Sequence, residues 1–180
     1  MDTTATQNRI FEAAVQEFAA FGIAGARVER IAKAAQTSKE RLYAYFRNKE
    51  ELYWQIAERE LGRLADATKL DATDLPEYAG RLFDYYEDHP ESQRLLSWGQ
   101  LESDEKAPSS VHWQSMVAEK TVKIAAAQAQ GLVDPTWSPL ELLYLISQVA
   151  ATWTGKASNS DRLRRRAVVV EAVRRFTRLP

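Results

Sequence analysis

The sequence of 180 residues contains no cysteine, only two histidines and two methionines, and few helix-interrupting residues, with seven glycines and six prolines. The absence of cysteine excludes disulfides and thiolate chemistry and is typical of a reducing compartment. The two histidines, His89 and His112, stand alone, and no nearby spacing of carboxylates or thiols indicates a metal site. We therefore expect neither a metal nor a cofactor.

Long apolar segments are also missing. The longest runs, such as residues 140–146, are far too short to span a bilayer. The first ten residues are polar and lack the apolar stretch of a secretory signal. We expect a cytoplasmic protein that does not bind membranes.

The usual signatures of an enzyme are absent as well. The sequence has no nucleophile–base pair, no cluster of metal ligands and no glycine-rich phosphate loop. Its 45% hydrophobic and 27% charged residues are ordinary for a globular protein. Because no segment alternates in the manner of a β-strand, the sequence predicts an all-α fold. Because the catalytic signatures are missing, we expect no enzymatic activity.

Hydrophobic periodicity and end signals predict about nine helices. Gly22 and Gly131 are expected to end helices, Asn48 to cap one, and Ser138 followed by Pro139 to begin one. Residues 108–110 and 155–160 are expected to be loops. The predicted helices cover residues 6–22, 28–35, 39–46, 49–69, 77–88, 90–101, 111–130, 140–154 and 161–179.

The near-neutral net charge of −1 conceals a segregation of charge. Residues 27–49 carry seven Lys and Arg against two acids, a local charge of about +5. Residues 71–106 carry ten acids against three bases, and residues 161–180 carry seven arginines against two acids. The arginines of the last segment could form a second DNA site, but we expect them to face solvent or to pair with the acidic segment.

The basic segment has the pattern of a helix-turn-helix unit that reads DNA. Helix 28–35 would be followed by a turn at Gln36 and Thr37, and Ser38 or Thr37 can cap the reading helix, 39–46. In such units the second helix enters the major groove and its N-terminal residues meet base edges. A cluster of cations with interleaved aromatic residues is typical of this function, although the same charges could simply be solvated.

This segment resembles the tetracycline-repressor (TetR) family of bacterial transcriptional regulators. The resemblance rests on TQNRIFEAAVQEFAAFG, then VERIAKAA, then TSKERLYAYFRNKEEL, which fall in the family's order and spacing within the first 52 residues. It implies an N-terminal three-helix DNA-binding domain at residues 1–48 and a C-terminal helical ligand-binding and dimerisation domain at residues 49–180.

The sequence departs from the family pattern where DNA would be read. The family usually has Gly-Val where Gln36 and Thr37 stand, and a small residue followed by Thr where Glu40 and Arg41 stand. Glu40 could complement the helix dipole or accept a hydrogen bond from cytosine. Arg41 is the best candidate for base readout. The predicted DNA-binding residues are Arg27, Val28, Gln36, Thr37, Ser38, Lys39, Glu40, Arg41, Tyr43, Tyr45, Arg47 and Lys49, of which Arg27, Tyr45, Arg47 and Lys49 are assigned to phosphates.

The resemblance further implies a homodimeric repressor that leaves a palindromic operator when a small molecule binds. The aromatic residues of the second half favour an apolar or aromatic effector, although such residues can equally belong to the core. The expected effector pocket consists of Phe83, Tyr86, Trp98, Trp113, Met116 and Ile146. The expected dimer interface, formed by the last two helices, consists of Leu142, Leu145, Val149, Trp153, Val170 and Val173.

Two other functions stay open at this point. A helical interaction or architectural module would keep the fold without specific reading of DNA. A small helical enzyme is the other alternative, and it would require a polar catalytic group within the pocket.

Overall fold

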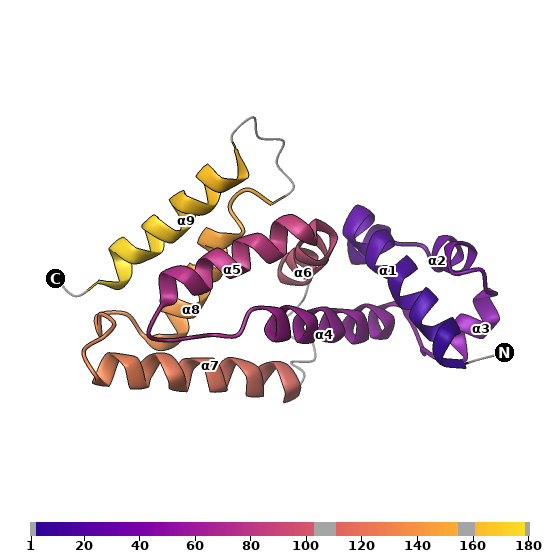
Figure 1. The fold of residues 1–180 in the computed structure, drawn as a ribbon. Helices are drawn as coiled ribbons and strands as arrows, with labels where there is room; N and C mark the ends of the chain where they lie inside the picture. Colours follow the sequence, from indigo (N-terminus) through magenta and orange to yellow (C-terminus); the bar gives the residue numbers. More distant parts are fainter. Residues whose placement is uncertain (1–2, 103–110, 155–160, 179–180) are drawn as a thin grey trace. The chain divides into compact units, whose positions relative to one another are not determined.

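The computed structural model describes residues 3–102, 111–154 and 161–178, without the side chains of residues 3 and 111–113. These residues form nine α-helices and contain no β-strand (Figure 1), so the predicted all-α fold is confirmed. The helices are α1 (Thr3–Gly25), α2 (Val28–Ala34), α3 (Lys39–Tyr43), α4 (Lys49–Ala67), α5 (Leu75–Asp88), α6 (Pro90–Glu102), α7 (Val111–Ala129), α8 (Pro139–Ala150) and α9 (Arg162–Thr177).

The predicted helix ends agree with most of these bounds. Asn48 accepts the backbone N–H of Glu51 at 2.7 Å and so caps α4. Ser138 caps α8 through a capping box with Glu141. The main differences are that α1 runs from Thr3 to Gly25 with a break at Gly22 instead of ending there, that α3 is shorter than predicted, and that α8 stops at Ala150. The loops expected at residues 108–110 and 155–160 lie outside the described residues.

The helices fall into two compact units. The first, which we call the head, contains the described residues of Met1–Leu61 and Glu91–Pro108. The second, the body, contains those of Gly62–Pro90 and Ser109–Pro180. The head thus includes α6 in addition to the helix-turn-helix segment, and the domain boundary expected at residue 48 stays a prediction.

An apolar stripe along α1 forms the centre of the head. Ile10, Ala14 and Phe18 recur at helical spacing, and all three are fully buried. The Phe18 ring meets the ring of Tyr53 edge-on, with the ring centroids 5.2 Å apart. This stripe packs α1 against the start of α4.

Phe21 is spaced to continue that stripe, but its side chain is 50% exposed. Phe21 directly precedes Gly22, whose φ of 70° and ψ of −177° interrupt the helix. The guanidinium of Arg30 lies 4.2 Å from the centre of the Phe21 ring. The ring therefore packs under a cation rather than in the core.

Helix α6 is bound to the end of α1 by two hydrogen bonds within the head. The Trp98 indole N–H donates to the carbonyl of Ala19 at 3.3 Å. The Glu102 carboxylate accepts the backbone N–H of Ala24 at 2.8 Å. Both bonds end on the segment of α1 that surrounds the break at Gly22, so α6 helps to fix the course of the chain there.

In the body, α5 packs along α9 and against α8, and α8 also contacts α7 and α9. Apolar side chains at helical spacing build this core. The fully or almost fully buried ones include Leu82, Phe83, Leu142, Ile146, Val169 and Val173.

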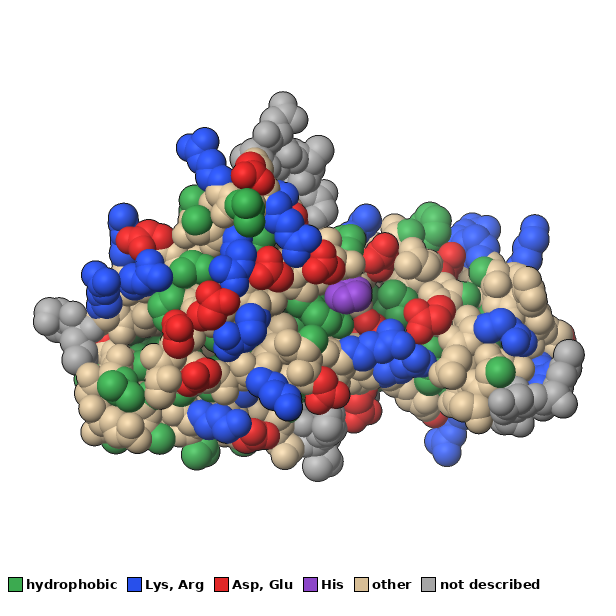
Figure 2. All heavy atoms as spheres, viewed as in Figure 1, with side chains coloured by type: hydrophobic (Ala, Val, Ile, Leu, Met, Phe, Trp, Pro, Cys, Tyr) green, Lys and Arg blue, Asp and Glu red, His purple; other side chains and the backbone are tan. Residues whose placement is uncertain are grey.

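Ion pairs join α5 and α9 along the edge of this core. Acidic and basic side chains intermingle over these helices on the face drawn in Figure 2. The expectation that the C-terminal arginines pair with the acidic segment is confirmed for three of them. The pairs are Arg162 with Asp84 and Asp88, Arg165 with Glu87, and Arg166 with Glu77 and Asp84.

The buried positions of α9 lie in its second half. Val169, Val173 and Thr177 are buried, whereas Leu163 near its start is 72% exposed. Arginines that bind α5 occupy the inner face at the start of α9 and turn Leu163 outward.

Among the described residues, no helix has both the length and the apolar character needed to cross a membrane.

Two helical glycines differ in their surroundings. A Cβ atom added to Gly99 on α6 would lie 2.5 Å from the hydroxyl oxygen of Tyr53, which is fully buried. That hydroxyl is fixed by its 2.7 Å hydrogen bond to the carbonyl of Leu95. A Cβ atom added to Gly62 on α4 would meet no atom within 4 Å.

We predict that Gly99→Ala lowers the free energy of unfolding by about 1–3 kcal/mol, because the rigid Tyr53 ring must move. Gly62→Ala, the matched control, should raise it by about 0.5–1 kcal/mol, because alanine favours a helix more than glycine does. Urea unfolding followed by circular dichroism measures both changes. Equal effects of the two substitutions would contradict the packing described for α6.

Candidate nucleic-acid interface

The helix-turn-helix unit consists of α2, a tight turn and α3. On α2, Val28, Ile31 and Ala32 are buried against the rest of the head. On α3, Leu42 is fully buried. These apolar contacts fix one face of each short helix and leave the opposite faces to solvent.

Gln36 makes the turn between the two helices with a left-handed backbone, at φ 53°. Its N–H donates to the carbonyl of Lys33 at 3.2 Å, and the N–H of Thr37 donates to the carbonyl of Ala32 at 2.9 Å. This pair of bonds is the Schellman motif, which closes a helix end and normally has glycine in the left-handed position. Gly131 at the end of α7 has the same two bonds with φ 70°.

The start of α3 is organised by Ser38 and Glu40. The Ser38 hydroxyl accepts the backbone N–H of Arg41 at 3.1 Å and so caps the helix. Hydrogen bonds from its own backbone N–H and from the Ser38 hydroxyl hold the pKa of the Glu40 carboxyl below its ordinary value. This geometry favours the structural role for Glu40 over the alternative of reading cytosine.

A buried carboxylate holds the entry to α2. Glu17 is 8% exposed and accepts the backbone N–H of Arg27 at 2.8 Å. It also accepts Nε of Arg30 at 2.8 Å, and this contact raises the pKa of the Arg30 guanidinium. Arg30 is therefore engaged inside the head and is not among the candidate DNA contacts.

Lys49 has a second function beside the one expected from the sequence. Its ammonium donates to the carbonyls of Ala24 at 3.0 Å and Ala26 at 3.4 Å. Because two of its donors hold the segment between α1 and α2, Lys49 ties the start of α4 to the helix-turn-helix unit. A role in binding phosphate stays a prediction.

Lys39, the first residue of α3, is paired with Glu29 on α2. Its ammonium also lies 5.9 Å from the centre of the Tyr43 ring. The hydrogen bond with Glu29 raises the pKa of Lys39 and lowers that of Glu29. Both side chains are well exposed, so the pair is weak and a phosphate can compete for the ammonium.

The structure brings eleven of the twelve predicted DNA-binding side chains to the exposed or half-buried surface of the head. Val28 is the exception: its side chain is 5% exposed and belongs to the core, so its assignment to DNA binding is wrong. The exposed residues are Arg27, Gln36, Ser38, Lys39, Glu40, Tyr43 and Arg47, and the half-buried ones are Thr37, Arg41, Tyr45 and Lys49. Lys33, which was not predicted, is also exposed.

The six residues expected in an effector pocket are divided between the two units, and a common pocket stays a prediction. Trp98 belongs to the head, whereas Phe83, Tyr86 and Ile146 lie in the core of the body. Met116 is half-buried on α7, and the side chain of Trp113 lies outside the described residues.

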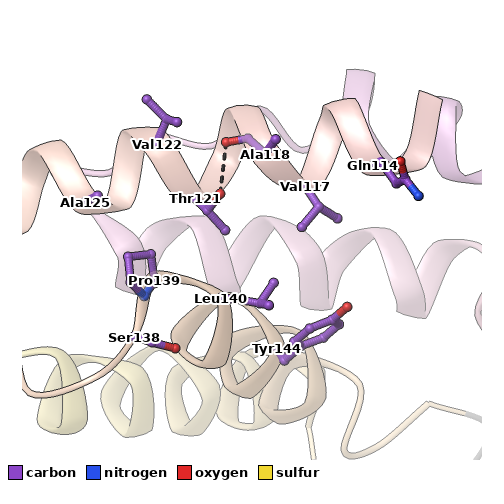
Figure 3. Close-up of a pocket in the computed structure, with 10 residues that line it drawn as sticks. All are labelled: Gln114, Val117, Ala118, Thr121, Val122, Ala125, Ser138, Pro139, Leu140 and Tyr144. Carbon is purple, nitrogen blue, oxygen red and sulfur yellow. Dashed lines mark hydrogen bonds between the residues drawn. The ribbon is translucent and has the colours of Figure 1, made fainter. Parts of the chain in front are cut away.

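An open groove of about 610 Å³ lies between α7 and α8, and its lining includes none of the five expected pocket residues whose side chains are described. Figure 3 shows Val117 and Thr121 of α7 on one side and Leu140 and Tyr144 of α8 on the other. Its remaining lining residues are Gln114, Ala118, Val122, Ala125, Ser138 and Pro139, so the lining that the structure describes contains no charged side chain. A largely apolar, open groove of this kind is typical of a contact surface.

The expected dimer interface is corrected at two positions. Leu142 and Val173 are fully buried inside the body, so they are core residues and not contacts for a second subunit. Leu145 is 39% exposed, and Val149, Trp153 and Val170 are half-buried. Other large apolar side chains on α8 and α9 are more exposed than these: Leu140, Tyr144, Leu163 and Val168. Hydrophobicity alone did not distinguish the core residues of α8 and α9 from the exposed residues that a second subunit could contact.

Within the described part of the chain, no group of three or more histidine or acidic side chains could hold a metal ion.

Comparisons with known proteins agree with this geometry. Residues 10–56 match the family model described as bacterial regulatory proteins, tetR family. Residues 74–175 match the model described as tetracyclin repressor-like, C-terminal domain. The HTH-type transcriptional repressor SCO4008 of Streptomyces coelicolor is 39% identical over 150 residues, which cover 83% of this chain and 78% of that protein.

Solved structures show the same fold. The crystal structure of SCO4942 from Streptomyces coelicolor has a TM-score of 0.84 at 48% identity, covering 97% of this chain and 99% of that one. A tetR-family bacterial regulatory protein from Rhodococcus RHA1 has a TM-score of 0.75 and covers 100% of both chains. At 20% identity, the second similarity concerns the fold alone.

The left-handed turn generates a prediction about stability. Gln36→Gly should raise the free energy of unfolding by up to about 1 kcal/mol, because glycine adopts this conformation without steric cost. The matched change at the other Schellman turn, Gly131→Ala, should lower it by about 1–2 kcal/mol. Thermal unfolding measures both. A loss of stability in Gln36→Gly would show that the Gln36 side chain contributes more than its backbone costs.

Proposed function

Because the chain belongs to the TetR family of bacterial DNA-binding transcriptional regulators, we propose that it is a homodimeric repressor that binds a palindromic operator and leaves it when a small molecule binds. Members of this family are not enzymes, and neither is this chain. DNA binding also places its proposed site of action in the cytoplasm.

The observation that carries the proposal is the exposed face of the helix-turn-helix unit. Arg27, Lys33 and Arg47 are exposed cations around α2 and α3, and Arg41 is half-buried on α3 itself. The Ser38 cap and the Gln36 turn hold α3 at a fixed angle to α2. A rigid short helix flanked by cations suits insertion into a major groove between two phosphate backbones.

We assign the contacts by side-chain chemistry and position. Arg41 is assigned to base readout, because a guanidinium can bond both acceptors of a guanine. Arg27 and Arg47 are assigned to phosphates, since they flank the unit at the start of α2 and after α3. Lys39 would exchange Glu29 for a phosphate on binding.

A second copy of the chain would provide the second half-site contact. One unit reads only a few base pairs, and two units on a palindrome must lie about one duplex turn apart, roughly 34–36 Å. Leu145, Leu163 and Val168 form exposed apolar positions on α8 and α9, which supports an interface there. Leu140 and Tyr144 extend these positions to the groove beside α7, which we include in the proposed interface.

The effector is proposed to bind in the body and to alter the separation of the two heads. An unknown small molecule with an apolar or aromatic body suits the aromatic core of this unit, where Phe83 and Tyr86 are buried. Release of DNA requires only that the effector bind one arrangement of the dimer more tightly than the other.

DNA binding is tested with two arginine variants. Arg41→Ala should cost about 1–3 kcal/mol on the preferred sequence and relax the preference at one base position. Arg47→Ala should weaken all sequences alike and reduce the slope of affinity against salt by about one. Gel shifts with cognate and shuffled duplexes at several salt concentrations measure these effects.

The control for these variants is Lys69→Ala, which removes an exposed cation from the body and should leave DNA binding unchanged. Equal affinity of the wild-type protein for cognate and shuffled DNA would refute the regulator and favour an architectural module.

The proposed dimer is tested at its exposed apolar positions. Leu145→Glu and Val168→Glu should each shift the protein from dimer to monomer, because a carboxylate would be buried at the interface without a partner. Leu132→Glu is the control, since Leu132 is 52% exposed in the connection after α7. Sedimentation equilibrium gives the mass; a monomeric wild-type protein at micromolar concentration would contradict the proposal.

A further inference from the structure

One lysine in the body lies where an amphipathic helix normally has an apolar residue. Lys120 on α7 is four residues before Ile124, which is fully buried, and seven before Ala127, which is 3% exposed. These positions share one face of the helix. Lys120 is therefore on the side of α7 that packs into the body, and only partly exposed.

The partner of Lys120 is a phenol rather than an acid. Its ammonium donates to the hydroxyl of Tyr78 on α5 at 3.1 Å and lies 5.4 Å from the centre of that ring. Tyr78 is 1% exposed. No acidic side chain among the described residues forms an ion pair with Lys120. Burial lowers the pKa of Lys120, and the nearby charge of Glu119 offsets this effect only in part.

The acids of the body are engaged elsewhere. Glu119, the nearest on α7, pairs with Lys123 on the outer side of the helix. The acids of α5 that form ion pairs bind the arginines of α9. Others bond to backbone or hydroxyl groups, as Asp71 does with Thr73 and Asp134 with Thr136. Among the described residues, the ammonium of Lys120 thus lies partly buried against a phenol, and the neighbouring Glu119 acts on it without forming an ion pair.

A second buried phenol lies further along α5. Tyr86 is two helical turns after Tyr78 on the same side of α5, and it is 7% exposed. Burial raises the pKa of Tyr86 to about 12 and that of Tyr78 further, the neighbouring Tyr86 adding to the latter shift. Both phenols are consequently neutral hydroxyls at physiological pH. One ammonium and two hydroxyls offer donors to a ligand that supplies negatively charged oxygen atoms.

We propose that Lys120, Tyr78 and Tyr86 form the polar end of the effector site, and that they bind the carboxylate of a small organic acid with an apolar or aromatic body. This inference rests on the proposed function, because it identifies the chemical class of the effector. The carboxylate would form an ion pair with Lys120, and the buried aromatic core would contact the remainder of the ligand.

The experiment compares acids with their neutral amides on the full chain. The probes are benzoate, phenylacetate and octanoate against benzamide, phenylacetamide and octanamide, with binding measured by calorimetry and thermal shift. At least one acid should bind at least ten-fold more tightly than its amide. Lys120→Met should abolish that preference, and Lys123→Met, which removes an exposed lysine from the same helix, should retain it.

Three outcomes of these binding measurements would contradict a carboxylate site at Lys120. Equal binding of every acid and amide, absence of binding by all three acids, or an undiminished preference for the acid in Lys120→Met would each overturn it. If Lys120→Met does not fold, Tyr86→Phe replaces it, because it removes only a hydroxyl and should weaken the same acid. DNA binding by the wild-type protein without added acid is measured separately. Absence of that binding would refute the proposed function and would leave the result for the acids unaffected.

Discussion

The angle between the two helices of the helix-turn-helix unit depends on one residue in a left-handed conformation, Gln36. Gln36 closes α2 with a Schellman motif and directs the chain into the Ser38 cap of α3. A different backbone at this residue would point α3 in another direction, whatever cations it carried. The entry to α2 is fixed independently by Glu17, which holds Arg27 and Arg30. The unit is therefore rigid at both ends before it meets DNA.

The charges of the chain separate into those that hold the structure and those that face solvent. Arg30, Lys39 and Lys49 all have partners within the head, so the count of seven cations in residues 27–49 overstates the charge available to phosphates. In the body, three arginines of α9 neutralise the acids of α5. The near-neutral total therefore conceals both the pairing of α5 with α9 in the body and the exposed cationic face of the helix-turn-helix unit.

Local signals in the sequence were sufficient to predict the helices and most of the exposed face of the head. Capping residues such as Asn48 and Ser138, and the glycines at positions 22 and 131, act on the backbone beside them, so a single sequence reveals their effect. Contacts between residues that are far apart in the sequence could not be predicted from such local signals. Hydrophobicity could not tell Leu142, a core residue, from Leu163, an exposed one, because both are apolar residues on amphipathic helices. One feature of the sequence could have placed Lys120 on the inner face of α7, namely its position four residues before Ile124.

If this chain reads DNA as a symmetric pair of helix-turn-helix units, selection of duplexes from a random pool with the purified protein, followed by sequencing, should enrich an inverted repeat. The half-site centres of that repeat should lie about 10–10.5 base pairs, or a multiple of that distance, apart. Absence of enrichment, or enrichment of a single half-site without a symmetric partner, would contradict this mode of binding.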